Sequence, residues 1–153
     1  MVANGTTHGN GASAAEALAL VRRLYTAGSI EEIEALLADD VVVTDWVTPG
    51  VELRGRASVM ERSFAPSAAA FEDASEEELY SMATPDRVLF CGRFSALFAG
   101  DYLGIPAHGR HVSWTILDTF EIRDASIARI WFGADTLAAA KALGAIAEAG
   151  APW

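Results

Sequence analysis

The sequence has few basic residues, a single cysteine and no long apolar run. It contains 11 lysines and arginines against 21 aspartates and glutamates, so its net charge is −10 and it should not bind nucleic acid. Cys91, as the only cysteine, can form neither an internal disulfide nor a cysteine-based metal cluster, and its apolar neighbours predict a buried, inert thiol. Charged residues and a glycine interrupt the alanine-rich C-terminal segment, so no membrane span is expected.

Residues 1–12 contain no lysine or arginine and therefore lack the basic region of a secretory signal. We accordingly expect a cytoplasmic protein. The same segment has no apolar periodicity, which predicts a flexible tail over residues 1–12 and a single domain over residues 13–153. Hydrophobic residues make up 52% of the sequence, enough for a dense core together with an apolar cavity or a subunit interface.

Helical spacing comes first along the chain, and strand patterns follow. Ser13 and Ser29 are candidate N-caps for two helices, the first over residues 14–26. A β-branched strand is predicted over residues 41–47 and a weaker helix over residues 55–70. The remaining strands are predicted over residues 77–83, 87–97, 110–123 and 127–133, before a final helix. Helices followed by an antiparallel meander predict the α+β class.

The strand that begins at His111 carries one carboxylate in an apolar row. Alternate residues from Val112 to Ile122 are apolar except Asp118, so this side chain should face the interior. A buried carboxylate must be hydrogen-bonded, paired or neutral, and such a group can perform acid/base chemistry. A purely structural, hydrogen-bonded Asp118 is an equal alternative.

Two further carboxylates lie close to tryptophans in the sequence. Asp135 comes four residues after Trp131, at the predicted junction of strand and helix, where local rules favour a helix cap. If the strand instead continues, Asp135 and Trp131 share a face and point into the same cavity. Asp45 shares its parity with Val43 and Val47 on an apolar face, and solvation at the sheet edge is the alternative for it.

The histidines add two groups that can exchange protons near neutral pH. His108 lies in a segment rich in glycine and proline over residues 100–109, a predicted loop and candidate lid, and His111 begins the next strand. Solvated side chains are the simpler interpretation of both. The sequence has no nucleophile elbow, phosphate loop, dinucleotide fingerprint or metal-ligating spacing. Carboxylates, histidines and an apolar pocket suit enolisation, aldol closure or isomerisation of a carbonyl compound.

Several short motifs follow one another in a recognisable order. They are Ala70-Phe71-Glu72-Asp73, Asp86-Arg87-Val88, the run from Gly100 to Pro106, Gly109-Arg110, Ile130-Trp131 followed by Asp135, and Ala142-Leu143-Gly144. Together these motifs resemble the SnoaL-like polyketide cyclases over roughly residues 14–144. The resemblance implies a cone-shaped, nuclear transport factor 2-like fold, a homodimer, and a cofactor-free intramolecular aldol cyclisation in which Asp135 is the acid/base. His108 and Cys91 depart from the family's common residues, which implies altered substrate contacts.

We therefore predict that a curved antiparallel or mixed sheet and N-terminal helices enclose an apolar pocket. The predicted activity is cyclisation of a hydrophobic, polyketide-like intermediate in a natural-product pathway, without metal or cofactor. The predicted catalytic residues are Asp135, Asp45, His111 and Asp118. The predicted substrate-binding residues are Trp46, Trp114, Trp131, Phe71, Tyr102 and His108.

Three other functions are compatible with the same fold. Asp45 resembles the position of the catalytic base in ketosteroid isomerase, which makes an isomerase the first alternative. An oxygenation component of an aromatic polyketide pathway is the second. A non-catalytic dimer that binds a small ligand is the third, because one fold can host many functions.

Overall fold

The computed structural model of the chain describes residues 13–45 and 50–146. The predicted tail over residues 1–12 lies outside the described residues. Within the described ranges, no helix is both long and apolar enough to cross a membrane.

Two helices open the described part of the chain, each with a serine at its N-cap. They are α1 (Ala14–Tyr25) and α2 (Ile30–Leu36). The hydroxyl of Ser13 accepts a hydrogen bond from the Glu16 N–H at 3.2 Å, and the Glu16 carboxylate accepts one from the Ser13 N–H at 2.6 Å. This reciprocal pair is a complete capping box. Ser29 caps α2 through one such hydrogen bond, so both predicted N-caps are confirmed.

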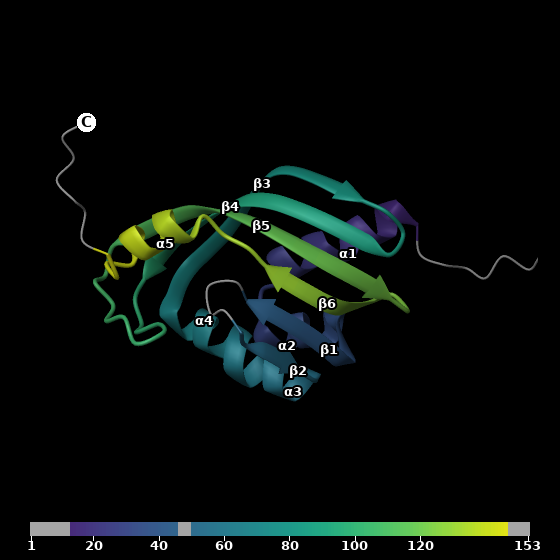
Figure 1. Cartoon of the computed structure of the whole chain (residues 1–153), viewed down its shortest axis with the longest axis horizontal. Helices are drawn as coiled ribbons and strands as arrows, with labels where there is room; N and C mark the ends of the chain where they lie inside the picture. Colours follow the sequence, from purple (N-terminus) through teal and green to yellow (C-terminus); the bar gives the residue numbers. More distant parts are fainter. Residues whose placement is uncertain (1–12, 46–49, 147–153) are drawn as a thin grey trace, which may run out of the picture.

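A six-stranded, curved and unclosed sheet follows, with the strand order β2-β1-β6-β5-β4-β3. The strands are β1 (Leu37–Asp45), β2 (Glu52–Arg54), β3 (Phe71–Ala83), β4 (Arg87–Phe98), β5 (His111–Arg123) and β6 (Ser126–Phe132). Strands β1 and β6 pair in parallel and every other pair is antiparallel. The predicted α+β class with a mixed sheet is confirmed. In Figure 1, α1 and α2 lie behind the sheet, and the face of β3 to β6 toward the viewer carries no helix from the N-terminal half.

The structure differs from the predicted elements in several places. Strand β1 begins at Leu37 rather than at residue 41. Strand β3 begins at Phe71 rather than Glu77, because pairing with the long β4 outweighs the low strand propensity of an acidic segment. The three-residue strand β2 was not predicted. The helix predicted over residues 55–70 is a succession of three helical pieces, α3 (Arg56–Val59), a π-helical turn η1 (Met60–Phe64) and α4 (Ala65–Ala70).

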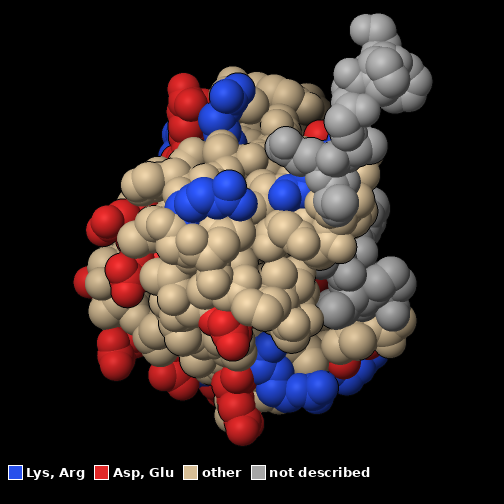
Figure 2. All heavy atoms as spheres, turned by 90° about the vertical axis from the view of Figure 1, so that its left-hand side faces the viewer, with Lys and Arg blue, Asp and Glu red and all other residues tan. Residues whose placement is uncertain are grey.

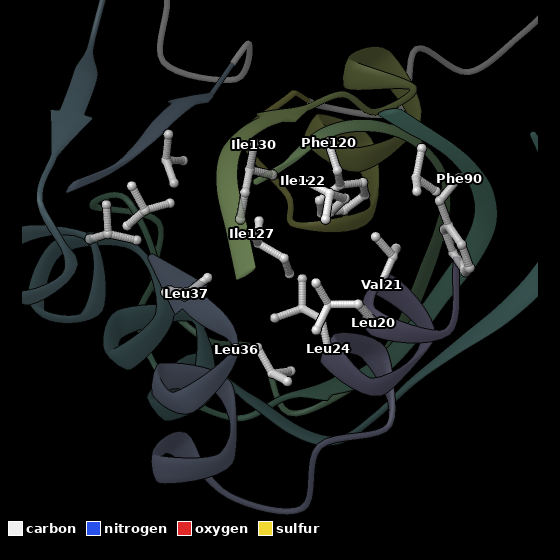
Figure 3. Packing of buried hydrophobic residues seen from close by; sticks show 14 of the residues in the cluster. Leu20, Val21, Leu24, Leu36, Leu37, Phe90, Phe120, Ile122, Ile127 and Ile130 are labelled. Carbon is white, nitrogen blue, oxygen red and sulfur yellow. The ribbon is translucent and has the colours of Figure 1, made fainter. Parts of the chain in front are cut away.

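The buried apolar residues form two clusters. In the larger one, Leu20, Val21 and Leu24 on α1 point toward Phe120 and Ile130 on the sheet (Figure 3). The smaller cluster joins the start of β3 and the ends of β4 and β5 to the final helix α5 (Thr136–Ala142) and the residue after it. Its members are Ala70, Phe71, Ala96, Phe98, Val112 and Leu143. Phe94 and Trp114 pack against both clusters, at the boundary where the sheet encloses an open space.

The central position of Ile130 yields a prediction for stability. Its side chain is fully buried, whereas that of Ile146 is 45% exposed. Replacing Ile130 with alanine should lower the free energy of unfolding by about 2–5 kcal/mol, because apolar burial is lost and a cavity remains. The same substitution at Ile146 should change it by less than about 0.5 kcal/mol. Urea denaturation of both variants measures the difference, and equal losses would contradict this description of the core.

Candidate active site

A cavity of about 500 Å³ lies between the helices and the concave face of the sheet. This volume is in the range of sites that hold small organic ligands. Its wall is mostly apolar and contains residues from the helices, the sheet strands and the loop between β4 and β5. The polar side chains that line it are Tyr25, Ser29, Asp45, Ser63, Ser67, Glu76, Tyr102 and Asp118. Figure 2 views the molecule from the left-hand side of Figure 1 and shows a central area of uncharged residues bordered by acidic and basic side chains.

Asp118 is the one buried charged residue of the described chain, with 3% of its surface exposed. It occupies the interior-facing row of β5, as the alternation predicts, and lines the cavity. The Tyr25 hydroxyl donates a hydrogen bond to Asp118 Oδ2, and the Gly133 N–H donates one to Oδ1 at 2.8 Å. Burial raises the pKa of Asp118 to about 7; the two hydrogen bonds lower it, and the charges of Asp45 and Glu76 add to the rise.

Gly133 brings the main chain close enough to reach this carboxylate. The glycine follows the last residue of β6, and its carbonyl accepts a hydrogen bond from the Leu117 N–H at 2.9 Å. A Cβ atom at position 133 would lie 2.4 Å from the Leu117 carbonyl oxygen, a distance that no side chain tolerates. Glycine is therefore required for the close approach that presents the N–H to Asp118.

Tyr25, the last residue of α1, supplies the other hydrogen bond to the acid. Its ring stacks on Phe90 with centroids 4.2 Å apart and meets Phe120 edge-on at 6.0 Å, so two core aromatics fix its position. Burial raises the pKa of Tyr25 well above its ordinary value, and the negative charge of Asp118 adds to this effect. The hydroxyl consequently stays protonated and acts as a donor at neutral pH.

Two more carboxylates face the same cavity. Glu76 on β3 is partly buried, and burial raises its pKa to about 7. Asp45, the last residue of β1, lines this cavity and a smaller hollow beside it. The cavity therefore contains two carboxyl groups, Asp118 and Glu76, that change protonation near neutral pH, and proton transfer at neutral pH requires such groups.

Aromatic side chains form the wall at the other end of the cavity. Phe71 contacts Phe94 at 5.3 Å, Tyr102 at 5.1 Å and Trp114 at 5.9 Å between ring centroids. Tyr102 comes from the loop between β4 and β5, the segment predicted as a candidate lid. Three predicted substrate-binding residues, Phe71, Tyr102 and Trp114, therefore lie together on the cavity wall, although their role in binding stays a prediction.

The structure places Asp135 outside the cavity lining. Its side chain is exposed and accepts a hydrogen bond from the Ala138 N–H at 3.0 Å, so it is the N-cap of α5. Strand β6 ends at Phe132 and does not extend through Asp135, which removes the geometry that would have aimed the carboxylate inward. The helix-cap interpretation from local sequence rules describes this position, and a catalytic role for Asp135 remains an untested prediction.

The other predicted site residues are distributed over the surface and the far side of the sheet. His111 is exposed, and His108 Nε2 lies 2.9 Å from the Ala142 carbonyl oxygen, where it ties the loop to α5. Trp131 lies on the outer face of the sheet, with the Arg129 guanidinium 4.7 Å above its ring. None of these three side chains lines the cavity. Trp46 lies outside the described residues.

Sequence reasoning did not identify Tyr25 and Glu76 as site residues. From the sequence, Tyr25 was a member of a helical repeat and no clear match to the first-helix tyrosine of ketosteroid isomerase, because its partner Asp118 is 93 residues away in the chain. Glu76 lies among acidic residues just before the predicted start of a strand. Strict alternation from the buried Phe71 would turn Glu76 outward; a register shift between Glu72 and Ser75 instead places Glu76 opposite Phe94, and no sequence pattern indicated this shift.

The cavity carboxylates do not form a metal centre of the usual kind. Across residues 13–45 and 50–146, no group of three histidine, cysteine, aspartate or glutamate side chains is arranged to hold a metal ion. Cys91 is buried, as predicted, and is not part of the cavity wall.

A sequence profile of the SnoaL-like polyketide cyclases matches residues 15–143. The match covers most of the chain, so the protein belongs to the SnoaL-like polyketide cyclase family. No curated protein sequence matches the chain.

Solved structures share the fold at low sequence identity. AclR from Streptomyces galilaeus, described as a proposed hydroxylase, has a TM-score of 0.77 and 22% identity over 90% of this chain and 86% of its own. TsrD from Streptomyces laurentii has a TM-score of 0.71 and 27% identity over 86% and 97% of the two chains. IdmH from Streptomyces antibioticus, a proposed polyketide cyclase, has a TM-score of 0.69 and 23% identity over 83% and 97%. These similarities establish the predicted nuclear transport factor 2-like fold.

The hydrogen bond from Tyr25 yields a prediction for the acid. Because this bond lowers the pKa of Asp118, replacing Tyr25 with phenylalanine should move that pKa above its value of about 7. Carbon-13 NMR of carboxyl-labelled aspartate across a pH titration measures the midpoint. Tyr80→Phe is the matched control, since Tyr80 is 54% exposed and away from the cavity. An unchanged or lowered midpoint in Tyr25→Phe would contradict the described contact.

Proposed function

We propose that the protein is a cyclase that closes a ring on a hydrophobic, polyketide-like intermediate by acid/base catalysis at Asp118. The observation that carries the proposal is the position of this carboxyl group, which is buried, hydrogen-bonded and open to a cavity of about 500 Å³. Membership of the SnoaL-like polyketide cyclase family supports the same reaction class.

The proposed step is an intramolecular aldol closure. The Asp118 carboxylate removes a proton from the carbon beside a substrate carbonyl, and the resulting enolate carbon forms a bond to a second carbonyl carbon of the same molecule. The oxygen of that second carbonyl becomes an alkoxide and takes the proton back from Asp118. A pKa of about 7 suits both halves of this cycle, because the group is then neither too weak a base nor too weak an acid at neutral pH.

Tyr25 and Gly133 hold Asp118 in position for this transfer. Their hydrogen bonds engage one carboxylate oxygen each and leave further lone pairs on both oxygens toward the cavity. The aromatic wall of Phe71, Phe94 and Trp114 offers flat apolar contact for the rings of a polyketide-like substrate. The proposal therefore assigns the chemistry to the Asp118 end of the cavity and binding to the aromatic end.

Enolisation alone tests the acid/base role without knowledge of the natural substrate. Wild-type protein should accelerate exchange of the methyl protons of 2-acetylnaphthalene for deuterium, measured by NMR in heavy water. Asp118→Asn should reduce the exchange rate by about 100-fold or more, because the amide cannot accept the proton. Asp135→Asn, at the exposed cap of α5, is the comparison variant. It distinguishes Asp118 as the acid/base, proposed here, from Asp135, which the family resemblance implies.

Each outcome of this experiment has a clear meaning. Full exchange by a folded Asp118→Asn variant would refute the proposed mechanism. Loss of exchange only in Asp135→Asn would transfer the acid/base role to that residue, and loss only in Asp45→Asn would favour the isomerase alternative, since Asp45 also lines the cavity. Absence of exchange by wild-type protein would favour a non-catalytic binding protein.

We also propose that the chain forms a homodimer through the outer face of the sheet. Tyr80, Met82 and Leu117 on β3 and β5 are 54%, 64% and 46% exposed on this face. The Arg87 guanidinium there forms an ion pair with Glu121, at 2.5 Å, which neutralises the charge of Glu121 and so reduces repulsion between two copies of a chain with net charge −10.

The dimer is tested by solution mass. Sedimentation equilibrium of the full chain should give twice the chain mass of 16.2 kDa. Met82→Glu should shift the mass toward the monomer, because two carboxylates would be desolvated in the interface. Leu137→Glu is the control, as Leu137 is equally exposed on α5, at 57%, and outside the proposed face. A monomeric wild-type protein, or a dimer unaffected by Met82→Glu, would contradict the proposal.

A further inference from the structure

The cavity has an uneven distribution of charge. Asp45, Glu76 and Asp118 line it, and within the described residues no lysine, arginine or histidine does so. Every lysine and arginine of the chain lies in the described part, so the absence of Lys and Arg from the lining is not a matter of undescribed segments. An ionised ligand would therefore meet carboxyl groups but no positive side chain.

Arginines on the elements around the cavity do not line it. Arg22, on α1, forms two hydrogen bonds with the Glu78 carboxylate at 2.7 and 2.8 Å, two residues along β3 from Glu76. Arg62 lines the smaller hollow beside the cavity, which Asp45 also lines. Arg129 pairs with Glu52 at 2.7 Å on the outer face. Arg22 and Arg129 are therefore paired with carboxylates other than Glu76 and Asp118.

Glu76 differs from Asp118 in having no hydrogen bond from any residue of the described chain. Asp118, by contrast, accepts two. The charge of Glu76 adds to the rise in the pKa of Tyr25, on α1, and of Asp118, on β5, and the register partner of Glu76 on β4 is the uncharged Phe94. Arg93, the next residue of β4, is exposed and pairs in register with Glu77 on the outer face. The Glu76 carboxylate is thus a partly buried acceptor that faces the ligand space.

We infer that the cavity selects ligands that carry no negative charge, that it prefers a protonated nitrogen where one is present, and that Glu76 is the residue that sets this preference. The inference deepens the proposed function and rests on the same cavity. A carboxylate or sulfate entering the site would lose water and gain no counter-ion, whereas an ammonium group would donate a charge-assisted hydrogen bond to the Glu76 carboxylate. Neutral aromatic ketones, esters and amides would bind through the aromatic wall.

A series of three probes with one ring system tests the inference on the full chain. The probes are 2-naphthoate, 2-naphthamide and 2-naphthylmethylamine, which share the naphthalene ring and carry a carboxylate, a neutral amide and an ammonium group at the same position. At about pH 8, where a carboxyl group with a pKa of about 7 is largely ionised, the amine and the amide should bind at least about tenfold more tightly than naphthoate. Isothermal titration calorimetry measures the three dissociation constants.

Glu76→Gln should reduce the differences in affinity among the three probes, because it removes the charge of the side chain and preserves its shape. Naphthoate should gain about tenfold in affinity and the amine should lose a similar factor, with the amide unchanged. Glu77→Gln is the matched control, because Glu77 is the next residue on the same strand but faces outward, opposite Arg93. It should leave all three affinities as in the wild type.

Lower pH should weaken the preference against naphthoate, as Glu76→Gln does. At about pH 5.5 both Glu76 and Asp118, each with a pKa of about 7, are mostly protonated, while naphthoate remains ionised. The ratio of the naphthoate to the naphthamide dissociation constant should therefore fall in wild-type protein between about pH 8 and about pH 5.5, and it should change less in Glu76→Gln.

Equal affinity of wild-type protein for naphthoate and naphthamide would overturn the inference. An unchanged preference in Glu76→Gln would overturn the role of Glu76, and failure of all three probes to bind would count against the cavity as a site for aromatic ligands. These measurements do not depend on turnover. An Asp118→Asn variant with undiminished exchange chemistry would refute the proposed reaction and leave the order of the three affinities intact.

Discussion

A carboxyl group inside an apolar core must be neutral or fully hydrogen-bonded, and this requirement at Asp118 organises the molecule around it. The contact with Tyr25 joins the end of the first helix to the middle of β5, and the contact with Gly133 joins β5 to the chain beyond β6. Three segments that are distant in sequence thus meet at one acid. Because the removal of either donor would leave one oxygen of a buried carboxyl group without its hydrogen bond, the same hydrogen bonds stabilise the fold and position the acid.

The division of the core into two clusters explains why an acid can be buried here at all. The larger cluster packs α1 and α2 against the sheet, and the smaller one packs α5 against the opposite end of β4 and β5. Phe94 and Trp114 contact both clusters and face the space between them. A sheet that curves but does not close leaves this space unfilled, so the side chains at its edge face a cavity rather than close-packed neighbours.

The sequence was sufficient to predict features that depend on local periodicity. The alternation along β5 placed Asp118 inside, and the serine caps placed the starts of α1 and α2. It was insufficient where contacts between distant segments decide the outcome. Tyr25 gains its importance from a residue 93 positions away, and Glu76 faces inward because the pairing of β3 with β4 shifts register between Glu72 and Ser75. At Asp135 the local rule was the better guide to structure: it predicted the helix cap that the structure contains, whereas the family resemblance implied an acid/base in the pocket.

The close approach at Gly133 has a consequence for how such a site evolves. A residue with no side chain controls one of the two hydrogen bonds to the acid, and the restriction comes from a backbone oxygen of the neighbouring strand that cannot move without breaking the ladder. Selection that preserves the hydrogen bonding of Asp118 must therefore also preserve glycine at position 133. The aromatic and small residues of the wall can be exchanged for others as the preferred substrate changes, whereas position 133 has no such freedom while Asp118 keeps its main-chain donor.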